Sequence, residues 1–98
     1  MNHILEFYSL LGENLKNNGI DEKALPISEA NTMLALYLSN NVLVLGGDLY
    51  VKKMDKGFEL FYADWFYEGD SVEDSINKAK SYLEQFGRKD LYVSFVVK

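Results

Sequence analysis

The chain has 98 residues, 48% of them hydrophobic and 26% charged, and its formal net charge at pH 7 is −5. This size and composition predict a single domain over residues 1–98 that builds a core without a metal or disulfide support. Because there is no cysteine, a disulfide framework, a thiolate zinc site and a cysteine nucleophile are excluded. The negative charge argues against nucleic acid and anionic membranes as partners.

The first residues, MNHILEFYSLLGENL, have no basic leader before the apolar positions and reach Glu6 at once. This pattern is typical of an amphipathic helix and not of a signal peptide. No uninterrupted apolar stretch approaches the roughly 20 residues that span a bilayer. A cytoplasmic protein is therefore expected.

Helical periodicity dominates the first forty residues. A stripe at spacings of three and four predicts a helix over residues 3 to about 17, stopped by Gly19. Residues 20–27 read as a linking loop with the only proline, and Ser28 as the N-cap of a second helix that closes at Asn40–Asn41. The apolar stripe of the first helix consists of Ile4, Phe7, Tyr8, Leu11 and Leu15.

After residue 41 the period changes to that of strands. Residues 42–54 are rich in β-branched and apolar side chains, and a turn at 55–57 leads into a second strand over 58–67, which predicts a hairpin. Ser71, with Asp74 three positions on, opens a third helix, and Gly87 is expected to end it. A terminal strand follows from Leu91 to Val97.

The resulting order is α-α-β-β-α-β, which places the chain in the α+β class. We expect a small antiparallel or mixed sheet with the helices packed on one face. The final strand–helix–strand connection could form a right-handed crossover and so create one parallel pair.

Few residues suggest catalysis. His3 is the only histidine and lies near a terminus, so neither a proton shuttle nor a transition-metal site is expected. Gly46-Gly47 is not followed by Lys-Ser/Thr or by a helix, so a phosphate loop is rejected. Paired glycines in a strand more often mark a bulge, a bend or a close approach of another backbone. The sequence thus predicts no catalytic residue, no metal, no cofactor and no enzyme.

The stretch FYADWFYEGD, residues 61–70, is the most unusual part of the chain. It lies between Lys56 and Lys78, where there are six carboxylates and no basic residue. Such a region attracts a basic partner, although an acidic face can also serve solubility alone. Strand alternation predicts one face with Phe58, Leu60, Tyr62, Asp64 and Phe66, and another with Glu59, Phe61, Ala63, Trp65 and Tyr67.

Both faces of this strand are too apolar to be freely solvated. If helices cover one face, then loops, a second subunit or a partner must cover the other. Trp and Tyr are favoured at binding hot spots, but Trp65 could equally belong to the core. The candidate partner-binding residues are Asp48, Tyr50, Tyr62, Asp64, Trp65, Tyr67, Glu68 and Asp70.

The chain resembles the immunity protein 40 family of bacterial polymorphic toxin systems. The resemblance rests on VLVLGGDLYVKK, with Gly46-Gly47-Asp48 inside a strand, and on YADWFYEGDSVEDSINKAKSYLEQF, with Tyr62-x-x-Trp65 and then a helix carrying Ala79 and Tyr82. It covers about the C-terminal 60 residues, while the first 40 match only in their helical pattern.

This resemblance implies a cytoplasmic protein that binds and neutralises a cognate toxin. An acidic, aromatic-rich surface would suit a toxin with a basic surface, such as the cleft of a nuclease. The alternative is a non-enzymatic interaction or regulatory protein that acts as a homodimer, with Trp65 at the dimer interface.

Overall fold

The computed structural model describes residues 12–14, 23–53, 57–87 and 90–98. This part of the chain contains five strands, two α-helices and a short 3-10 helix. The strands are β1 (Glu13–Asn14), β2 (Lys23–Pro26), β3 (Val44–Lys53), β4 (Gly57–Phe66) and β5 (Leu91–Val97). The helices are the 3-10 helix η2 (Ile27–Glu29) and the α-helices α2 (Ala30–Ser39) and α3 (Val72–Leu83).

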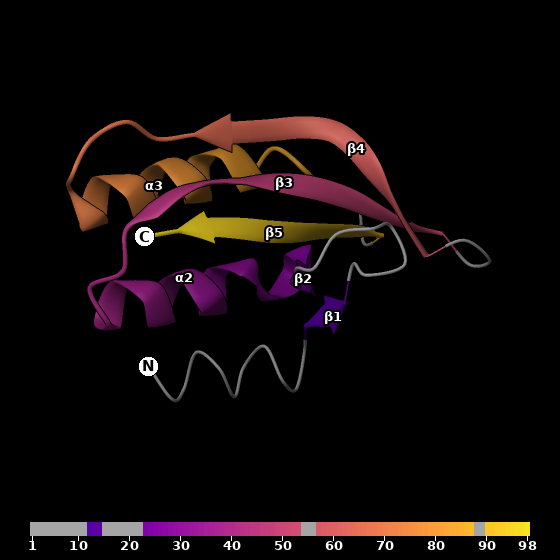
Figure 1. Ribbon diagram of the computed structural model, residues 1–98, viewed down its shortest axis with the longest axis horizontal. Helices are drawn as coiled ribbons and strands as arrows, with labels where there is room; N and C mark the ends of the chain where they lie inside the picture. The colour runs from indigo at the N-terminus through magenta and orange to yellow at the C-terminus, as the bar shows by residue number, and fades with distance from the viewer. Residues whose placement is uncertain (1–11, 15–22, 54–56, 88–89) are drawn as a thin grey trace.

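The strands form one sheet in the order β1-β2-β5-β3-β4, and every pair in it is antiparallel (Figure 1). The predicted α+β class is confirmed. Of the two alternatives, antiparallel or mixed, the sheet is the antiparallel one, and the parallel pair that the last connection could have formed is not made. The chain leaves β4, passes through α3 and enters the sheet again at β5, but β3 lies between the two strands. The crossover therefore skips one strand, so β4 and β5 run in the same direction without pairing.

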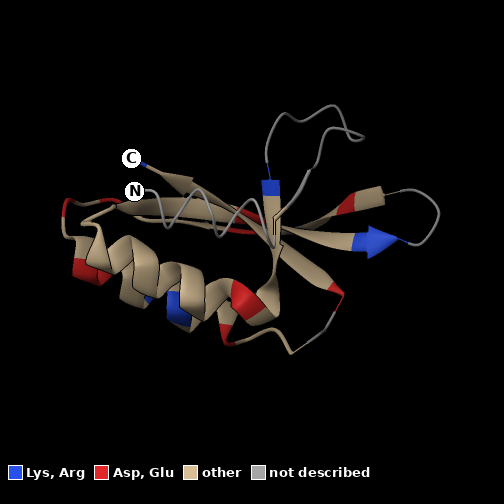
Figure 2. Cartoon of the chain, turned by 90° about the horizontal axis from the view of Figure 1, so that it is seen from below, with Lys and Arg blue, Asp and Glu red and all other residues tan. Residues whose placement is uncertain are grey.

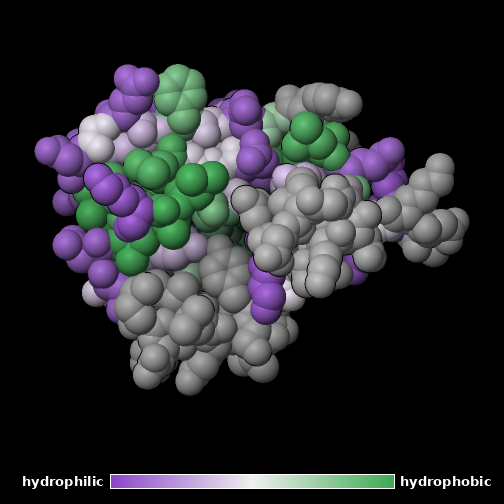
Figure 3. Space-filling view, in the orientation of Figure 1, coloured by the Kyte–Doolittle hydropathy of each residue, from purple (hydrophilic) through white to green (hydrophobic). Residues whose placement is uncertain are grey.

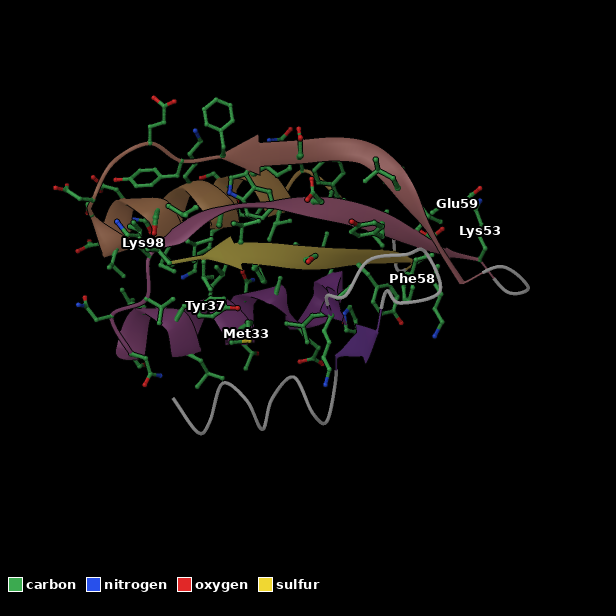
Figure 4. All side chains as sticks on the ribbon, viewed as in Figure 1. Met33, Tyr37, Lys53, Phe58, Glu59 and Lys98 are labelled. Carbon is green, nitrogen blue, oxygen red and sulfur yellow. The ribbon has the colours of Figure 1, made fainter. Side chains whose placement is uncertain are left out.

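Both α-helices pack on the same face of the sheet, as predicted (Figure 2). The main core forms between this face and the helices. Figure 4 shows Met33 and Tyr37 of α2 lying next to β5, and the Tyr37 ring meets Phe95 edge-on at 5.6 Å. We call the opposite face of the sheet the outer face. Its own smaller cluster consists of Ala24, Tyr50 and Phe58, with Tyr92 packed against them.

The second half of the chain follows the prediction closely. The hairpin of β3 and β4 is present, and the positive φ of 72° at Gly57 fits a turn. Ser71 caps α3, because its hydroxyl accepts a hydrogen bond from the Asp74 backbone N–H at 3.2 Å. One further contact ties α3 to the sheet: the buried Ser75 hydroxyl accepts from the Val44 N–H at 3.1 Å and donates to the Val72 carbonyl.

The first half of the chain differs from the sequence prediction in three places. Residues 23–26, predicted as part of a loop, form strand β2, which pairs with both β1 and β5. Ser28 lies inside η2 and does not cap α2, whose N-cap Glu29 makes no side-chain capping bond. The predicted helix over 3–17 falls mainly outside the described residues, and Glu13–Asn14, within its range, form β1.

Helix α3 ends earlier than predicted. Its last residue is Leu83, and the N–H groups of Gln85 and Phe86 then bond the Tyr82 and Leu83 carbonyls in tight turns. Gly87 therefore lies beyond the helix and does not cap it. Across the described ranges, no helix is long and apolar enough to cross a membrane.

Candidate functional site: the outer face and free edge of strand β4

Gly46 and Gly47 have a structural role, as predicted, and each has its own reason to be glycine. The register between β3 and β5 shifts between Val44 and Gly46, and a Cβ at Gly46 would collide with the Trp65 backbone carbonyl. At Gly47 a Cβ would lie 2.6 Å from Cη2 of the Trp65 indole and 2.8 Å from the Ser94 carbonyl oxygen. The two glycines therefore let β4 approach β3 and let the indole lie across β3.

Trp65 belongs to the core, which resolves the two interpretations left open by the sequence. Its side chain is 7% exposed and faces the helices. The indole stacks at a tilt on Tyr82 of α3, with ring centroids 5.2 Å apart, and meets Phe95 edge-on at 6.0 Å. The buried indole N–H has no hydrogen-bond acceptor among the described residues. A homodimer centred on Trp65 loses its main support, because the indole is not at the surface.

Since Trp65 faces the helices, its neighbours in β4 face outward. Phe61, Ala63 and Trp65 contact the main core, so the pleat directs Asp64 and Phe66 to the outer face. The register between β3 and β4 shifts between Asp48 and Tyr50, where β4 carries two extra residues. Because the shift is by two, the alternation that the sequence predicted for β4 is preserved.

Two carboxylates of the candidate set meet on the outer face. Asp48 of β3 and Asp64 of β4 lie directly opposite each other in the register. Together with Leu60 and Ala63 they line a shallow hollow of about 240 Å³ beside the register shift. Asp64 is exposed on this face, so its carboxylate gives the hollow a negative side that attracts a cationic group.

An exposed aromatic ring follows immediately along β4. Phe66 is 67% exposed, and in the register it lies opposite Gly46, which in turn lies opposite the 44% exposed Val96 of β5. Figure 3 shows hydrophobic atoms gathered at this end of the face. The Lys78 ammonium of α3 lies 5.4 Å from the centroid of the Phe66 ring, a cation–π distance. Sequence alternation placed Phe66 on the same face as Asp64, but nothing in the sequence distinguished it as exposed.

The loop after β4 carries the other predicted carboxylates. Glu68 and Asp70 are both exposed, and Figure 2 shows the acidic positions at this end of the molecule. Tyr67 is half-buried beneath the loop: its backbone N–H donates to the Leu45 carbonyl, and its hydroxyl accepts from the Ser71 N–H at 3.3 Å. Tyr67 thus holds the loop in place, and Glu68 and Asp70 project from it. We call Asp64, Glu68 and Asp70 the acidic ridge.

Tyr50, one of the predicted contact residues, lies apart from this surface. Tyr50 is on the outer face but is only 4% exposed, packed in the small cluster with Phe58. The Tyr62 side chain lies outside the described part of the structure, although its backbone belongs to β4. At the far end of the hairpin, Lys53 and Glu59 form an ion pair at 3.5 Å (Figure 4). The acidic ridge and Asp48 therefore lie near Phe66, Trp65 lies beneath them in the main core, and Tyr50 belongs to the separate small cluster.

Asp64 also influences the pKa of a side chain on α3, Tyr82. Burial raises the pKa of Tyr82 above its ordinary value of 10.0, and the negative charge of Asp64 raises it further. Because β4 is a terminal strand of the sheet, a carboxylate on its outer face can still influence a phenol on α3.

Replacing Asp64 by asparagine is expected to lower the Tyr82 pKa without returning it to 10.0, because the contribution of burial remains. NMR titration of tyrosine labelled with ¹³C in the ring would measure this, with Tyr82→Phe assigning the resonance. Glu84→Gln, at the exposed C-cap of α3, is the control. An unchanged Tyr82 pKa in the Asp64→Asn variant would contradict the placement of this carboxylate.

Among the described residues, no group of three His, Asp or Glu side chains is arranged to hold a metal ion. The carboxylates between residues 64 and 74 are instead spread over the strand end, the loop and the first turn of α3. There, Glu73 and Asp74 lie where a helix dipole favours negative charge.

Comparison with known proteins identifies the family. No curated protein and no solved structure matches the chain. The sequence profile of the family described as Immunity protein 40 matches residues 14–97, so the match extends well beyond the C-terminal 60 residues on which the sequence resemblance rested. It includes the paired glycines, Trp65 and the acidic ridge. The chain therefore belongs to the Immunity protein 40 family.

Proposed function

We propose that this protein binds a cognate bacterial toxin in the cytoplasm and neutralises it through the outer face and acidic ridge at the end of β4. The observation that carries the proposal is the exposure of Phe66 beside Asp64, Glu68 and Asp70. A large aromatic ring left in water costs free energy unless a partner covers it, and aromatic anchors dominate protein interfaces. Family membership supplies the class of partner.

Charge indicates what kind of toxin surface fits. The acidic ridge lies at one end of a protein with a net charge of −5, so its potential attracts a basic surface and repels nucleic acid. A toxin that binds nucleic acid presents a basic cleft of this kind. An immunity protein placed over that cleft would both speed association and block access of the substrate.

The proposed mechanism is occlusion and requires no chemistry from this chain. Core residues such as Trp65 hold β3 and β4 in register, and Tyr67 fixes the loop that carries Glu68 and Asp70. These contacts fix the strand and loop before the partner arrives. Affinity is then not reduced by the cost of ordering the strand and loop on binding.

Co-expression with a candidate toxin, sought among the genes next to the one for this chain, would test the proposal. Cells that produce the C-terminal effector domain of that toxin are expected to grow only when this protein is co-produced. An effector made inactive by substitution should form a stable complex with it, measured by calorimetry. Sedimentation of the protein alone measures its oligomeric state, and a dimer that persists on dilution would favour the homodimer alternative. If the effector kills cells equally in both cases and no complex forms, the proposed function is wrong.

A further inference from the structure

The free edge of β4 offers a second kind of contact next to the side chains of the outer face. β4 is a terminal strand in the sheet order and, among the described strands, pairs only with β3. Edge strands that have to remain unpaired are usually protected by charged side chains, especially lysine, by proline or by a β-bulge. The ten residues of β4, GFELFYADWF, contain neither lysine nor proline, and the register shift of β4 lies between Leu60 and Asp64, before the segment from Asp64 to Phe66.

The direction of the backbone groups follows from one hydrogen bond. The Tyr67 N–H donates to the Leu45 carbonyl at 2.8 Å, which places Tyr67 in a hydrogen-bonded position opposite β3. In an antiparallel pair these positions alternate, so Trp65 also directs its N–H and C=O toward β3. Asp64 and Phe66 then direct theirs away from β3, at the free edge. Both residues are exposed, Phe66 to 67%.

The side chains at this edge indicate what an added strand would contain. Asp64 and Phe66 are two positions apart and share the outer face, so two residues of an added strand, also two apart, would lie beside them. The residue beside Asp64, which also faces Asp48, would be lysine or arginine. The residue beside Phe66 would be apolar and would cover the ring. Glu68 and Asp70 of the acidic ridge extend the negative charge into the loop, so basic residues of the added segment are favoured there as well.

We propose that the toxin adds an extended segment to the free edge of β4, pairing with the outward N–H and C=O groups of Asp64 and Phe66. The segment carries a basic and an apolar residue two positions apart. This inference rests on the proposed function, since the occupant is part of the toxin, but it specifies how the toxin binds. Main-chain hydrogen bonds supply affinity in strand addition, and the alternating side chains supply specificity.

A pair of substitutions at one position separates backbone pairing from side-chain contact. Phe66→Ala removes the ring and keeps the N–H, whereas Phe66→Pro removes both. The outward N–H of Phe66 makes no bond to β3, so proline there leaves the pairing of β3 and β4 intact. The proline variant is expected to bind the inactive effector domain about tenfold more weakly than the alanine variant, since it lacks one intermolecular hydrogen bond. Equal affinities of the two folded variants would overturn the inference.

Hydrogen exchange of the unmodified protein provides a measurement that does not depend on whether the proline variant folds. Binding of the inactive effector domain is expected to slow exchange of the Asp64 and Phe66 amides strongly. If a complex forms but these amides exchange as in the free protein, strand addition is wrong while the immunity function stands. If the amides are protected in the protein alone as its concentration rises, the occupant is a second copy and the inference is also wrong. If no complex forms, the proposed function fails and this inference fails with it.

Discussion

Truncation of Trp65 to alanine is expected to lower the free energy of unfolding by about 3–5 kcal/mol, as for other buried large aromatic residues. The indole joins three elements: it lies over Gly47 of β3, stacks on Tyr82 of α3 and meets Phe95 of β5. Its loss leaves a cavity in the main core. Urea denaturation followed by circular dichroism measures the change, because the variant has no tryptophan fluorescence. A loss below about 1 kcal/mol would contradict the core position of Trp65.

The close contact between Gly47 and the Trp65 indole also predicts the effect of adding a methyl group at Gly47. Gly47→Ala places a Cβ within 2.6 Å of the indole and 2.8 Å of the Ser94 carbonyl, and overpacking of this kind costs about 1–3 kcal/mol. Combining it with Trp65→Ala should reduce that cost, since the collision with the indole disappears and only the backbone contact remains. Gly87→Ala is the matched control: apart from its chain neighbours, no atom of the described residues lies within 4 Å of its added Cβ, so little change is expected. Additive costs in the double variant would exclude contact between Gly47 and the indole.

Neutralising the acidic ridge is expected to slow toxin association by about one to two orders of magnitude at low salt. The variant is Asp64→Asn with Glu68→Gln and Asp70→Asn, three exposed positions whose carboxylates have no role in the core. Folding should be retained, and the dependence of the association rate on ionic strength should become shallower. Stopped-flow or surface binding kinetics with the inactive effector domain would measure both.

The matched control for the acidic ridge removes charge elsewhere. Glu29→Gln with Glu84→Gln neutralises two carboxylates near the opposite ends of α2 and α3, and it is compared with the double variant Asp64→Asn, Asp70→Asn. If binding depended only on net charge, the two double variants would behave alike. A larger effect at the acidic ridge would locate the steering field there, and equal rates would remove the acidic ridge from the proposed surface.

The second half of the fold could be predicted because its signals are local. The Ser71 cap, the hairpin and the terminal strand each depend on neighbours within a few residues or on a simple period. Strand β2 could not be predicted, since Lys23–Pro26 is a short segment that becomes a strand through pairing with β5, nearly seventy residues away. The place of β5 between β2 and β3 is equally non-local, which is why the sequence leaves both an antiparallel and a mixed sheet open.

The candidate surface could be predicted only in outline. Alternation along β4 separated the Trp65 side from the Asp64 side correctly, but it did not reveal which side the helices cover. That choice depends on the packing of α2 and α3 and on the space that Gly47 leaves for the indole. Consequently, the sequence predicts Trp65 as a contact residue and does not single out Phe66, the most exposed large apolar side chain described.

If the toxin covers the end of β4, as proposed, an NMR footprint will locate it there. Unlabelled inactive effector domain would be titrated into the ¹⁵N-labelled protein. Shifts or line broadening are expected at Asp64, Phe66, Glu68 and Asp70, with the exposed face of α2 unaffected. A footprint confined to α2 and α3, for example around the hollow of about 300 Å³ beside Phe86, would contradict toxin binding at the end of β4.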